Sequence, residues 1–345
     1  MNVEIDLGAI GRNLLRIGKA TGKPLILMVK ADAYGHGMMR VARAVNAPCY
    51  GVATETEGVP LRELGKEVLV TAPSLYGVSL VRRYDMIPLI GDVSLAKEAA
   101  AQGVKRCHLA INSGMNRLGL TGEKEVFRVA SSLFRAGVRI TGVATHYKDG
   151  SDGTIKAQNA AFDRAILALG SAAAECGASE RIVSHVTGNG ALFAKGYDAL
   201  RVGLAAYGYH SGFHTAGLPL EKAMRVTSVV IKAKEIGKGD TLGYTGSFRA
   251  TKRCRAYTIL GGYGDGIARE ERGRKVIAAG RRLRIAAVSM DSTETVSDRV
   301  DLSVGDRVII LSEGLDAEYI AAYRGTIPYE VLLGYDVPRA NRSYD

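Results

Sequence analysis

Residues 25–37 read LILMVKADAYGHG, a short apolar run followed by a lysine and a glycine-containing turn. An apolar run of this length that ends in turn residues predicts a buried strand. Lys30 leaves that strand onto the turn, where partial loss of water favours the neutral amine, the form that acts as a nucleophile. A surface lysine that caps a strand is the commoner case. The residues that follow Lys30 are therefore needed to distinguish a catalytic lysine from a surface lysine.

The length and hydrophobicity of the chain predict two domains. It has 345 residues, 47% hydrophobic and 23% charged, a mix typical of globular proteins, and single hydrophobic cores stop growing near about 250 to 300 residues. The N-terminus shows no basic segment followed by an apolar stretch, and no run of about 18 apolar residues occurs. We therefore expect a cytoplasmic protein with no membrane partner.

Cysteine spacing and charge argue against two further classes of protein. The four cysteines stand far apart, without the paired spacing of a disulfide framework or a zinc site, so we expect no metal. The net charge of +11 would suit an anionic partner, but no lysine and arginine tract alternates with aromatic residues and tryptophan is absent. We expect no nucleic-acid partner.

Eight apolar runs alternate with helical stretches in the first two thirds of the chain. They lie at 25–30, 50–54, 67–71, 86–90, 106–111, 139–145, 181–186 and 199–206, and the alanine-rich stretches 93–102 and 156–176 are two of the predicted helices. This alternation predicts an α/β fold, a closed parallel (β/α)8 barrel of the TIM type. Chemistry in such barrels collects at the carboxyl ends of the strands.

The pattern changes after about residue 216. Short β-branched runs at 225–231, 274–279, 283–289 and 307–311, separated by glycine turns, predict a C-terminal all-β domain. The linker is expected at 210–219, where Gly, Ser, Thr and Pro cluster. We expect the barrel at 1–215 and the β domain at 216–345, with the first few residues able to join the β domain.

The motif at 29–37, VKADAYGHG, resembles the signature of the alanine racemase family, and the resemblance runs in one order from Val3 to Tyr344. It implies pyridoxal 5'-phosphate (PLP) as the cofactor, bound by the barrel. Lys30 matches the lysine that forms a Schiff base with PLP, and Tyr34 the tyrosine that contacts its phosphate. The resemblance also implies a homodimer with shared active sites.

A second motif, residues 199–208, resembles the family stretch around the cofactor ring. It implies Arg201 at the pyridine nitrogen and the backbone N–H groups of Gly203 and Leu204 at the phosphate. A permanently charged guanidinium discourages protonation of that nitrogen and so disfavours side reactions such as transamination. His146 and His185 match two histidines that link this arginine to the catalytic tyrosine, His146 at the cofactor and His185 in support. Tyr329 matches a second phosphate-binding tyrosine of the family. We also expect the backbone N–H groups of Asn189 and Gly190 at the phosphate, because a helix start with glycine offers unpaired donors to an anion.

Residues 239–244 resemble the family segment that carries the second base, which implies that Tyr244 enters the active site of the partner subunit. One base on each face of a planar carbanion is the minimum for inverting a stereocentre. The family assigns the tyrosine to the L enantiomer and the lysine, here Lys30, to the D enantiomer. Arg117, Tyr263 and the backbone N–H of Met290 match the groups that contact the amino acid substrate.

The chain departs from the family pattern at two places. Ala110 stands where many members carry a carbamylated lysine that holds the arginine equivalent to Arg117, and Asn112 replaces an aspartate. The family's phosphate-contacting serine after the seventh strand is also absent. Alanine is the expected substrate, and serine or a basic amino acid such as lysine or ornithine is the alternative.

Two other protein classes stay open. A PLP-dependent decarboxylase of basic amino acids shares the architecture, but it places an acidic residue where Arg201 stands and has no Tyr244 segment. A non-catalytic PLP-binding homeostasis protein has a similar lysine but consists of a barrel alone. The sequence does not say whether the D-amino acid serves biosynthesis, as a peptidoglycan precursor, or is degraded.

Overall fold

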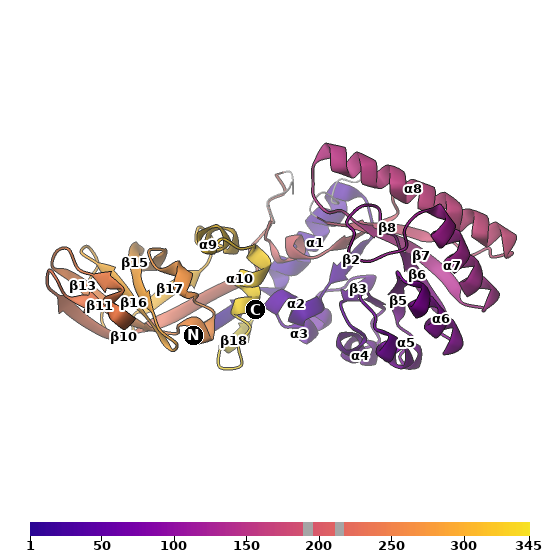
Figure 1. The fold of residues 1–345 in the computed structure, drawn as a ribbon. Helices are drawn as coiled ribbons and strands as arrows, with labels where there is room; N and C mark the ends of the chain where they lie inside the picture. The colour runs from indigo at the N-terminus through magenta and orange to yellow at the C-terminus, as the bar shows by residue number, and fades with distance from the viewer. Residues whose placement is uncertain (189–195, 211–216) are drawn as a thin grey trace.

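Eight short strands close a parallel barrel in the computed structural model, which describes residues 1–188, 196–210 and 217–345 (Figure 1). They are β2 (Leu25–Met28), β3 (Cys49–Val52), β4 (Val68–Val70), β5 (Ile87–Ile90), β6 (Arg106–Ala110), β7 (Arg139–His146), β8 (Val183–Thr187) and β9 (Ala199–Val202). Each pairs with the next, and β9 pairs with β2 through Leu25 and Leu200. The predicted barrel is confirmed. The last predicted run is too long, since β9 ends before Gly203 and the short turn η3 (Leu204–Tyr207) follows.

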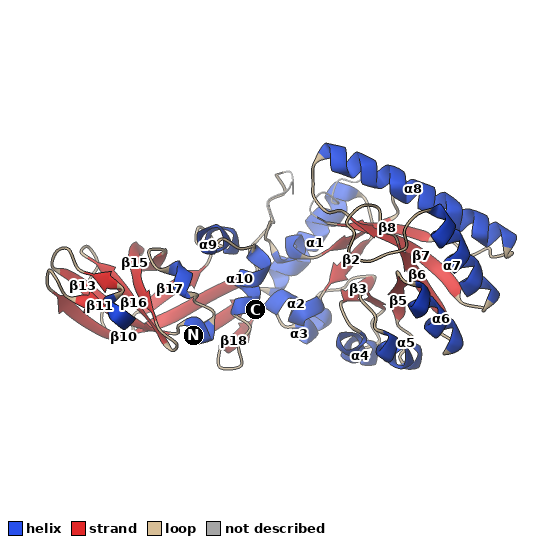
Figure 2. Ribbon diagram, viewed as in Figure 1, coloured by secondary structure: helices blue, strands red, loops and turns tan. Residues whose placement is uncertain are grey.

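Helices surround the barrel strands (Figure 2). They are α1 (Leu7–Thr21), α3 (Met38–Ala44), α4 (Glu55–Glu63), α5 (Val78–Arg83), α6 (Val93–Ala101), α7 (Glu123–Arg135) and α8 (Asp152–Glu175). Their ends follow ordinary capping chemistry: the Asp6 side chain accepts from Ala9 N at 2.7 Å at the start of α1, and Gly22 ends that helix with a positive φ. The helices expected at 93–102 and 156–176 correspond to α6 and α8.

The turn after β2 has an unusual backbone. Its helical segment α2 (Lys30–Gly35) winds left-handed, with φ between 48° and 56° at the four residues 31–34, none of which is glycine. His36 Nδ1 lies 3.0 Å from the carbonyl oxygens of both Ala33 and Tyr34. The Asp32 carboxylate accepts from Met38 N at 2.7 Å. These contacts fix the turn that begins with Lys30.

The rest of the chain forms a second sheet, here called the β domain, with strand order β13-β16-β15-β14-β17-β10-β1-β18. The strands are β1 (Asn2–Ile5), β10 (Met224–Ile236), β13 (Cys254–Leu260), β14 (Lys275–Ala278), β15 (Arg281–Val288), β16 (Ser292–Ser297), β17 (Arg307–Leu311) and β18 (Asn341–Tyr344). A small hairpin, β11 (Thr241–Leu242) and β12 (Phe248–Arg249), and the helices α9 (Ala317–Arg324) and α10 (Pro328–Gly334) complete it. Pairing is antiparallel except between β1 and β18.

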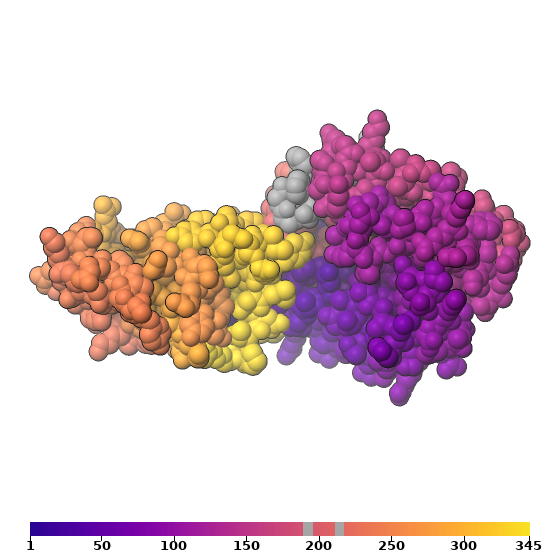
Figure 3. All heavy atoms as spheres, viewed as in Figure 1, coloured from indigo at the N-terminus to yellow at the C-terminus, as the bar shows by residue number. Residues whose placement is uncertain are grey.

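The two parts of the molecule meet at α2 and α10. The first strand, β1, belongs to the β domain, where it pairs with β10 and β18, and the chain passes from β1 into the barrel. Figure 3 shows two lobes, with the C-terminal residues in yellow against the indigo N-terminal part of the barrel. Arg342 of β18 contacts the Asp32 carboxylate at 3.4 Å, so the β domain packs directly on the left-handed turn.

None of the helices within the described ranges combines the length and the apolar character needed to cross a bilayer.

Candidate active site

Lys30 is half-buried directly after β2, at the carboxyl end of a barrel strand. Burial lowers the pKa of its amine, and the positive charges of Arg117 and Arg201 lower it further, while Glu57 acts in the opposite direction. Glu57 is held in place by accepting from Ala31 N and Ala53 N, each at 2.7 Å. The neutral form of the Lys30 amine is thus favoured, as a nucleophile requires.

Tyr34 places its hydroxyl group between the turn and β9. Its ring is buried, 5.3 Å from the Tyr207 ring and 5.6 Å from the Tyr329 ring, measured between centroids. A Cβ atom at Gly203 would lie 2.5 Å from the Tyr34 hydroxyl oxygen, so only glycine fits there. Among the described residues the N–H groups of Gly203 and Leu204 have no hydrogen-bond partner, and they open the turn η3. Unpaired N–H groups at such a start attract anions.

A buried hydrogen-bond chain runs from Arg201 through two histidines. Arg201 Nη1 lies 2.6 Å from His185 Nδ1, and its Nη2 donates to Thr145 O at 2.8 Å. His185 Nε2 lies 2.8 Å from His108 Nδ1. Because a guanidinium only donates, His185 Nδ1 must accept, and its proton lies on Nε2 and points to His108. Burial lowers the pKa of His108 to about 3 and that of His185 in the same direction, so both stay neutral.

His108 was missed by the sequence analysis. It lies on β6, and a Cβ atom at Gly142 of β7 would collide with its ring, so the glycine makes room for it. The signal was a polar residue inside a barrel strand next to a strand with an interior glycine. His185, near the end of the predicted run 181–186, is the third of five residues in β8 and fully buried, so it lies inside the strand and not at its carboxyl end.

His146 ends β7, as expected, close to three positive side chains. Its pKa falls to about 3, first because of burial and then because of Arg201, Arg117 and Lys30. The neutral imidazole therefore faces the same region as the Lys30 amine.

Arg117 lies on the exposed loop after β6, near enough to Lys30 and Arg201 to lower the pKa of both. Asn112 does not take over the missing lysine's role. Its Oδ1 accepts from Gly114 N at 3.2 Å and Asn116 N at 2.9 Å, so it holds the loop backbone.

The candidate residues of the β domain lie at its surface. The Tyr244 side chain is 69% exposed, Met290 52% and Tyr263 43%. Tyr244 follows β11 by two residues, and β11 lies at the end of the β domain away from α2 (Figure 1). One chain therefore does not bring Tyr244 to Lys30. Within the described residues the Met290 N–H has no hydrogen-bond partner and is available to a ligand.

Positive charge dominates the group of residues around Lys30. The charges of Arg117 and Arg201 lower the pKa of Lys30, and the charge of Arg117 also lowers the pKa of Arg201. Among the described residues, Glu57 is the carboxylate that raises the pKa of Lys30. The group suits an anionic ligand. Asn189 and Gly190 lie outside the described residues. Three or more potential metal ligands do not come together anywhere in the segments that the structure describes.

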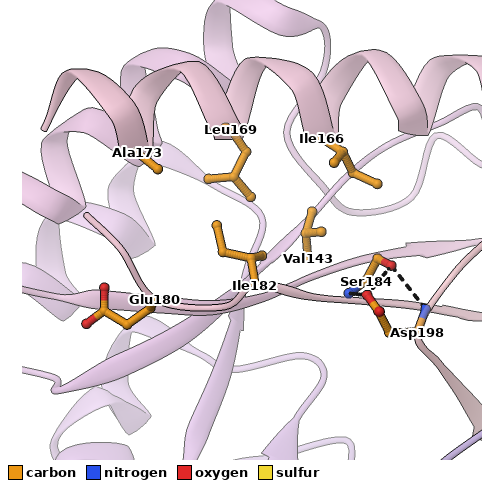
Figure 4. A pocket seen from close by; sticks show the side chains of 9 residues that line it. Val143, Ile166, Leu169, Ala173, Glu180, Ile182, Ser184 and Asp198 are labelled. Carbon is orange, nitrogen blue, oxygen red and sulfur yellow. Dashed lines mark hydrogen bonds between the residues drawn. The ribbon is translucent and has the colours of Figure 1, made fainter. Parts of the chain in front are cut away.

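A pocket of about 350 Å³ lies elsewhere, between α8 and the strands β7 and β8 (Figure 4). Its wall is mainly apolar, and Ser184 Oγ donates to the Asp198 carboxylate at 2.7 Å at one side. Ile182 and Ser184 stand at the amino end of β8, so the pocket lies away from the strand ends that carry Lys30 and His146.

Comparisons with known proteins agree with this geometry. Residues 5–211 match the model "Alanine racemase, N-terminal domain", and residues 223–344 match "Alanine racemase, C-terminal domain". The chain is 31% identical to the alanine racemase of Thermodesulfovibrio yellowstonii, over 100% of this chain and 97% of that protein.

Solved structures give the same result. The alanine racemase from Bacillus anthracis with bound L-Ala-P has a TM-score of 0.87 at 26% identity, covering 99% of this chain and 94% of that one. The alanine racemase from Bartonella henselae with covalently bound pyridoxal phosphate, 23% identical, shares the fold with a TM-score of 0.89 over 100% and 99% of the two chains.

Proposed function

The chain belongs to the alanine racemase family and catalyses the PLP-dependent interconversion of L- and D-alanine; we propose that Lys30 and the Tyr244 of a partner subunit are its two bases. The observation that carries this assignment is the half-buried Lys30 amine, whose pKa is lowered beside Arg117 and Arg201. A surface lysine at a strand end would not be desolvated in this way.

The residues around Lys30 fit the cofactor. A bound PLP carries a phosphate and a phenolic oxygen, and the site offers the guanidinium groups of Arg117 and Arg201, two unpaired N–H groups at residues 203–204 and the buried Tyr34 hydroxyl. In this assignment Lys30 attaches the cofactor, and Arg201, held by His185, faces its pyridine nitrogen. Tyr34, Tyr329, Gly203 and Leu204 would hold the phosphate, with Asn189 and Gly190 as further candidates, and His146 would contact the cofactor from the end of β7.

When bound, PLP withdraws electrons from the Cα of the amino acid and makes its proton acidic. Lys30 exchanges that proton on one face and Tyr244 on the other, so that removal by one residue and delivery by the other inverts Cα. Arg117 and the Met290 N–H bind the substrate carboxylate, with Tyr263 at the entrance. A guanidinium and a free N–H are suitable donors for a carboxylate.

A homodimer completes the site in this proposal. Tyr244, Tyr263 and Met290 have large side chains that are exposed on the single chain, so a second chain can reach all three. In a two-fold dimer the β domain of each chain covers the strand ends of the other barrel. The division at residues 1–215 and 216–345 assigns one half of each site to each domain. The cytoplasmic location stays a prediction.

Mixed dimers test the shared site. Lys30→Ala chains should bind no cofactor covalently and have no activity, whereas Tyr244→Phe chains should keep the cofactor's visible absorbance and racemise L-alanine about 10²- to 10⁴-fold more slowly. A mixture of the two should regain activity, because one of the two sites in each mixed dimer has an intact barrel and an intact β domain. Verified mixed dimers without any recovery would show that Tyr244 acts within its own chain.

A further inference from the structure

Arg339 joins two loops of the β domain that are far apart in sequence. It lies between α10 and β18, and its Nε and Nη2 reach the two Asp265 carboxylate oxygens at 2.7 and 2.8 Å. Its Nη1 contacts Asp291 Oδ1 at 2.6 Å, and Nη2 also reaches Met290 O at 3.3 Å. One guanidinium thus makes a two-pronged contact with one loop and closes on the other.

The two loops are also joined through their backbones. Tyr263 N donates to Ser289 O at 2.9 Å, and Gly264 N donates to Met290 O at 3.0 Å. A side chain at Gly264 would collide with the Arg339 guanidinium, so the loop approaches Arg339 as closely as glycine allows. Asp265 is only 5% exposed and also accepts from Gly262 N at 3.0 Å. The loops and Arg339 form one rigid unit.

This unit carries both substrate contacts assigned to the β domain. Tyr263 and Met290 project from it, and the Met290 N–H is unpaired within the described residues. Two carboxylates, Asp265 and Asp291, belong to this unit, and their charge would repel the carboxylate of an incoming amino acid. Arg339 contacts both of them and offsets one of their two negative charges. Its Nη2 also donates to the Met290 carbonyl oxygen, and the Ser289 carbonyl, which shares a peptide group with the Met290 N–H, accepts from Tyr263 N.

We propose that Arg339 is a positioning residue that sets substrate affinity in the partner subunit's active site, an inference that rests on the proposed function. It holds the Tyr263 loop against the Met290 segment and offsets one of the two negative charges of Asp265 and Asp291, without touching the reacting atoms. Removal of the Arg339 side chain should therefore weaken binding of the substrate carboxylate and leave the two bases and the cofactor in place.

Steady-state kinetics with both enantiomers of alanine test this role. Arg339→Met should raise KM about 10- to 100-fold and change kcat less than about 3-fold, with the cofactor's visible absorbance unchanged. Arg339→Lys, which keeps the charge but loses the fork, should raise KM by a smaller factor. Arg307→Met, which removes an exposed contact to Glu4 at 3.1 Å on β17, is the matched control and should leave both constants unchanged.

Asp291→Asn provides a second variant if Arg339→Met does not fold, because the Asp291 side chain is 67% exposed and its replacement loosens one arm of Arg339. It should lower KM, because one repelling carboxylate is lost while Arg339 keeps its two contacts to Asp265. An unchanged KM in Arg339→Lys and Asp291→Asn, or a loss confined to kcat, would overturn the proposal.

Mixed dimers assign the effect to the partner's site. In dimers of Arg339→Met and Lys30→Ala chains, the active site with Lys30 receives an intact β domain from the Lys30→Ala chain, so its KM should equal that of the wild type. The raised KM of Arg339→Met in such dimers would contradict the assignment. If the Lys30→Ala and Tyr244→Phe mixture recovers activity at the same time, only the role of Arg339 fails and the proposed function stands.

Discussion

Gly203 shows how a single absent methyl group shapes the proposed cofactor site. The Tyr34 hydroxyl approaches the backbone of Gly203 so closely that a Cβ atom would lie 2.5 Å from its oxygen. Tyr34 is buried between two other rings and has little room to move away. A larger residue at position 203 must therefore displace the hydroxyl group that would contact the phosphate.

Gly203→Ala is predicted to weaken cofactor binding about tenfold or more, because overpacking at a buried site costs about 1 to 3 kcal/mol. Titration of the cofactor-free protein with PLP, followed by its absorbance, measures this. Gly11→Ala is the control, since an added Cβ at Gly11 of α1 meets no atom within 4 Å and should leave affinity unchanged. Equal affinities of the two variants would remove Tyr34 and Gly203 from the phosphate site.

Residues in the local motif were predictable, and residues that depend on contacts between strands were not. Lys30 and Tyr34 lie in one stretch of nine residues whose order carries the signal. His108 became visible only when β6 and β7 were side by side, because the space for its ring is provided by Gly142. The role of Asn112 in holding the loop backbone likewise depends on geometry that its sequence position does not reveal.

At the scale of elements, the left-handed turn at residues 31–34 is the strained part of the barrel. A residue other than glycine in this conformation costs roughly 1 to 2 kcal/mol, and four follow one another. The His36 imidazole offsets part of this cost by bonding to the carbonyl groups of Ala33 and Tyr34. Such strain persists where the surroundings hold it, and here it sets the direction in which Lys30 leaves β2.

His36 should make folding stability depend on pH. Burial lowers its pKa to about 4, below the value of about 6.5 in an unfolded chain. Between these values the unfolded state binds more protons, so the free energy of unfolding falls as pH drops from about 6.5 to about 4, by up to about 3 kcal/mol from this group. Urea unfolding of the wild type and of His36→Gln measures it.

The variant is expected to be less stable than the wild type at pH 7, because it loses the imidazole contacts to the turn. The difference should narrow as pH falls, since His36→Gln has no such proton to take up. A difference that stays constant between pH 7 and pH 4 would contradict a buried neutral His36.

Strands were predicted well from apolar runs, whereas the shape of the turn between them was not. The predicted run 307–311 coincides with β17, and seven of the eight barrel runs agree with observed strands within about three residues. The left-handed turn contains alanine, aspartate and tyrosine, residues that rarely adopt positive φ. Its conformation follows from contacts with His36, Glu57 and Arg342, which lie outside the turn itself.

At the scale of the whole molecule, the β domain serves two barrels in our proposal. One end packs on its own barrel, where Tyr329 contacts Tyr34 and Arg342 contacts Asp32. Tyr244 follows β11 toward the far end, whereas the loops joined by Arg339 lie beside α10, where Gly266 approaches Gly334; in our proposal both serve a second chain. No sequence pattern gives the distance between Lys30 and Tyr244, because it depends on the dimer. The order of motifs along the chain predicted Lys30 and Tyr244 as candidates, and the arrangement of the two chains in the dimer determines whether their side chains come together.

Deuterium uptake from heavy water most directly tests inversion by two opposed bases. L-alanine incubated with the enzyme in heavy water should give D-alanine that carries deuterium at Cα from the first turnovers, because the proton delivered comes from a second, solvent-exchanged group. Serine, lysine and ornithine, assayed alongside, should invert more slowly than alanine. D-alanine that keeps the original proton, or no inversion of alanine at all, would contradict the assignment of Lys30 and Tyr244 as the two bases.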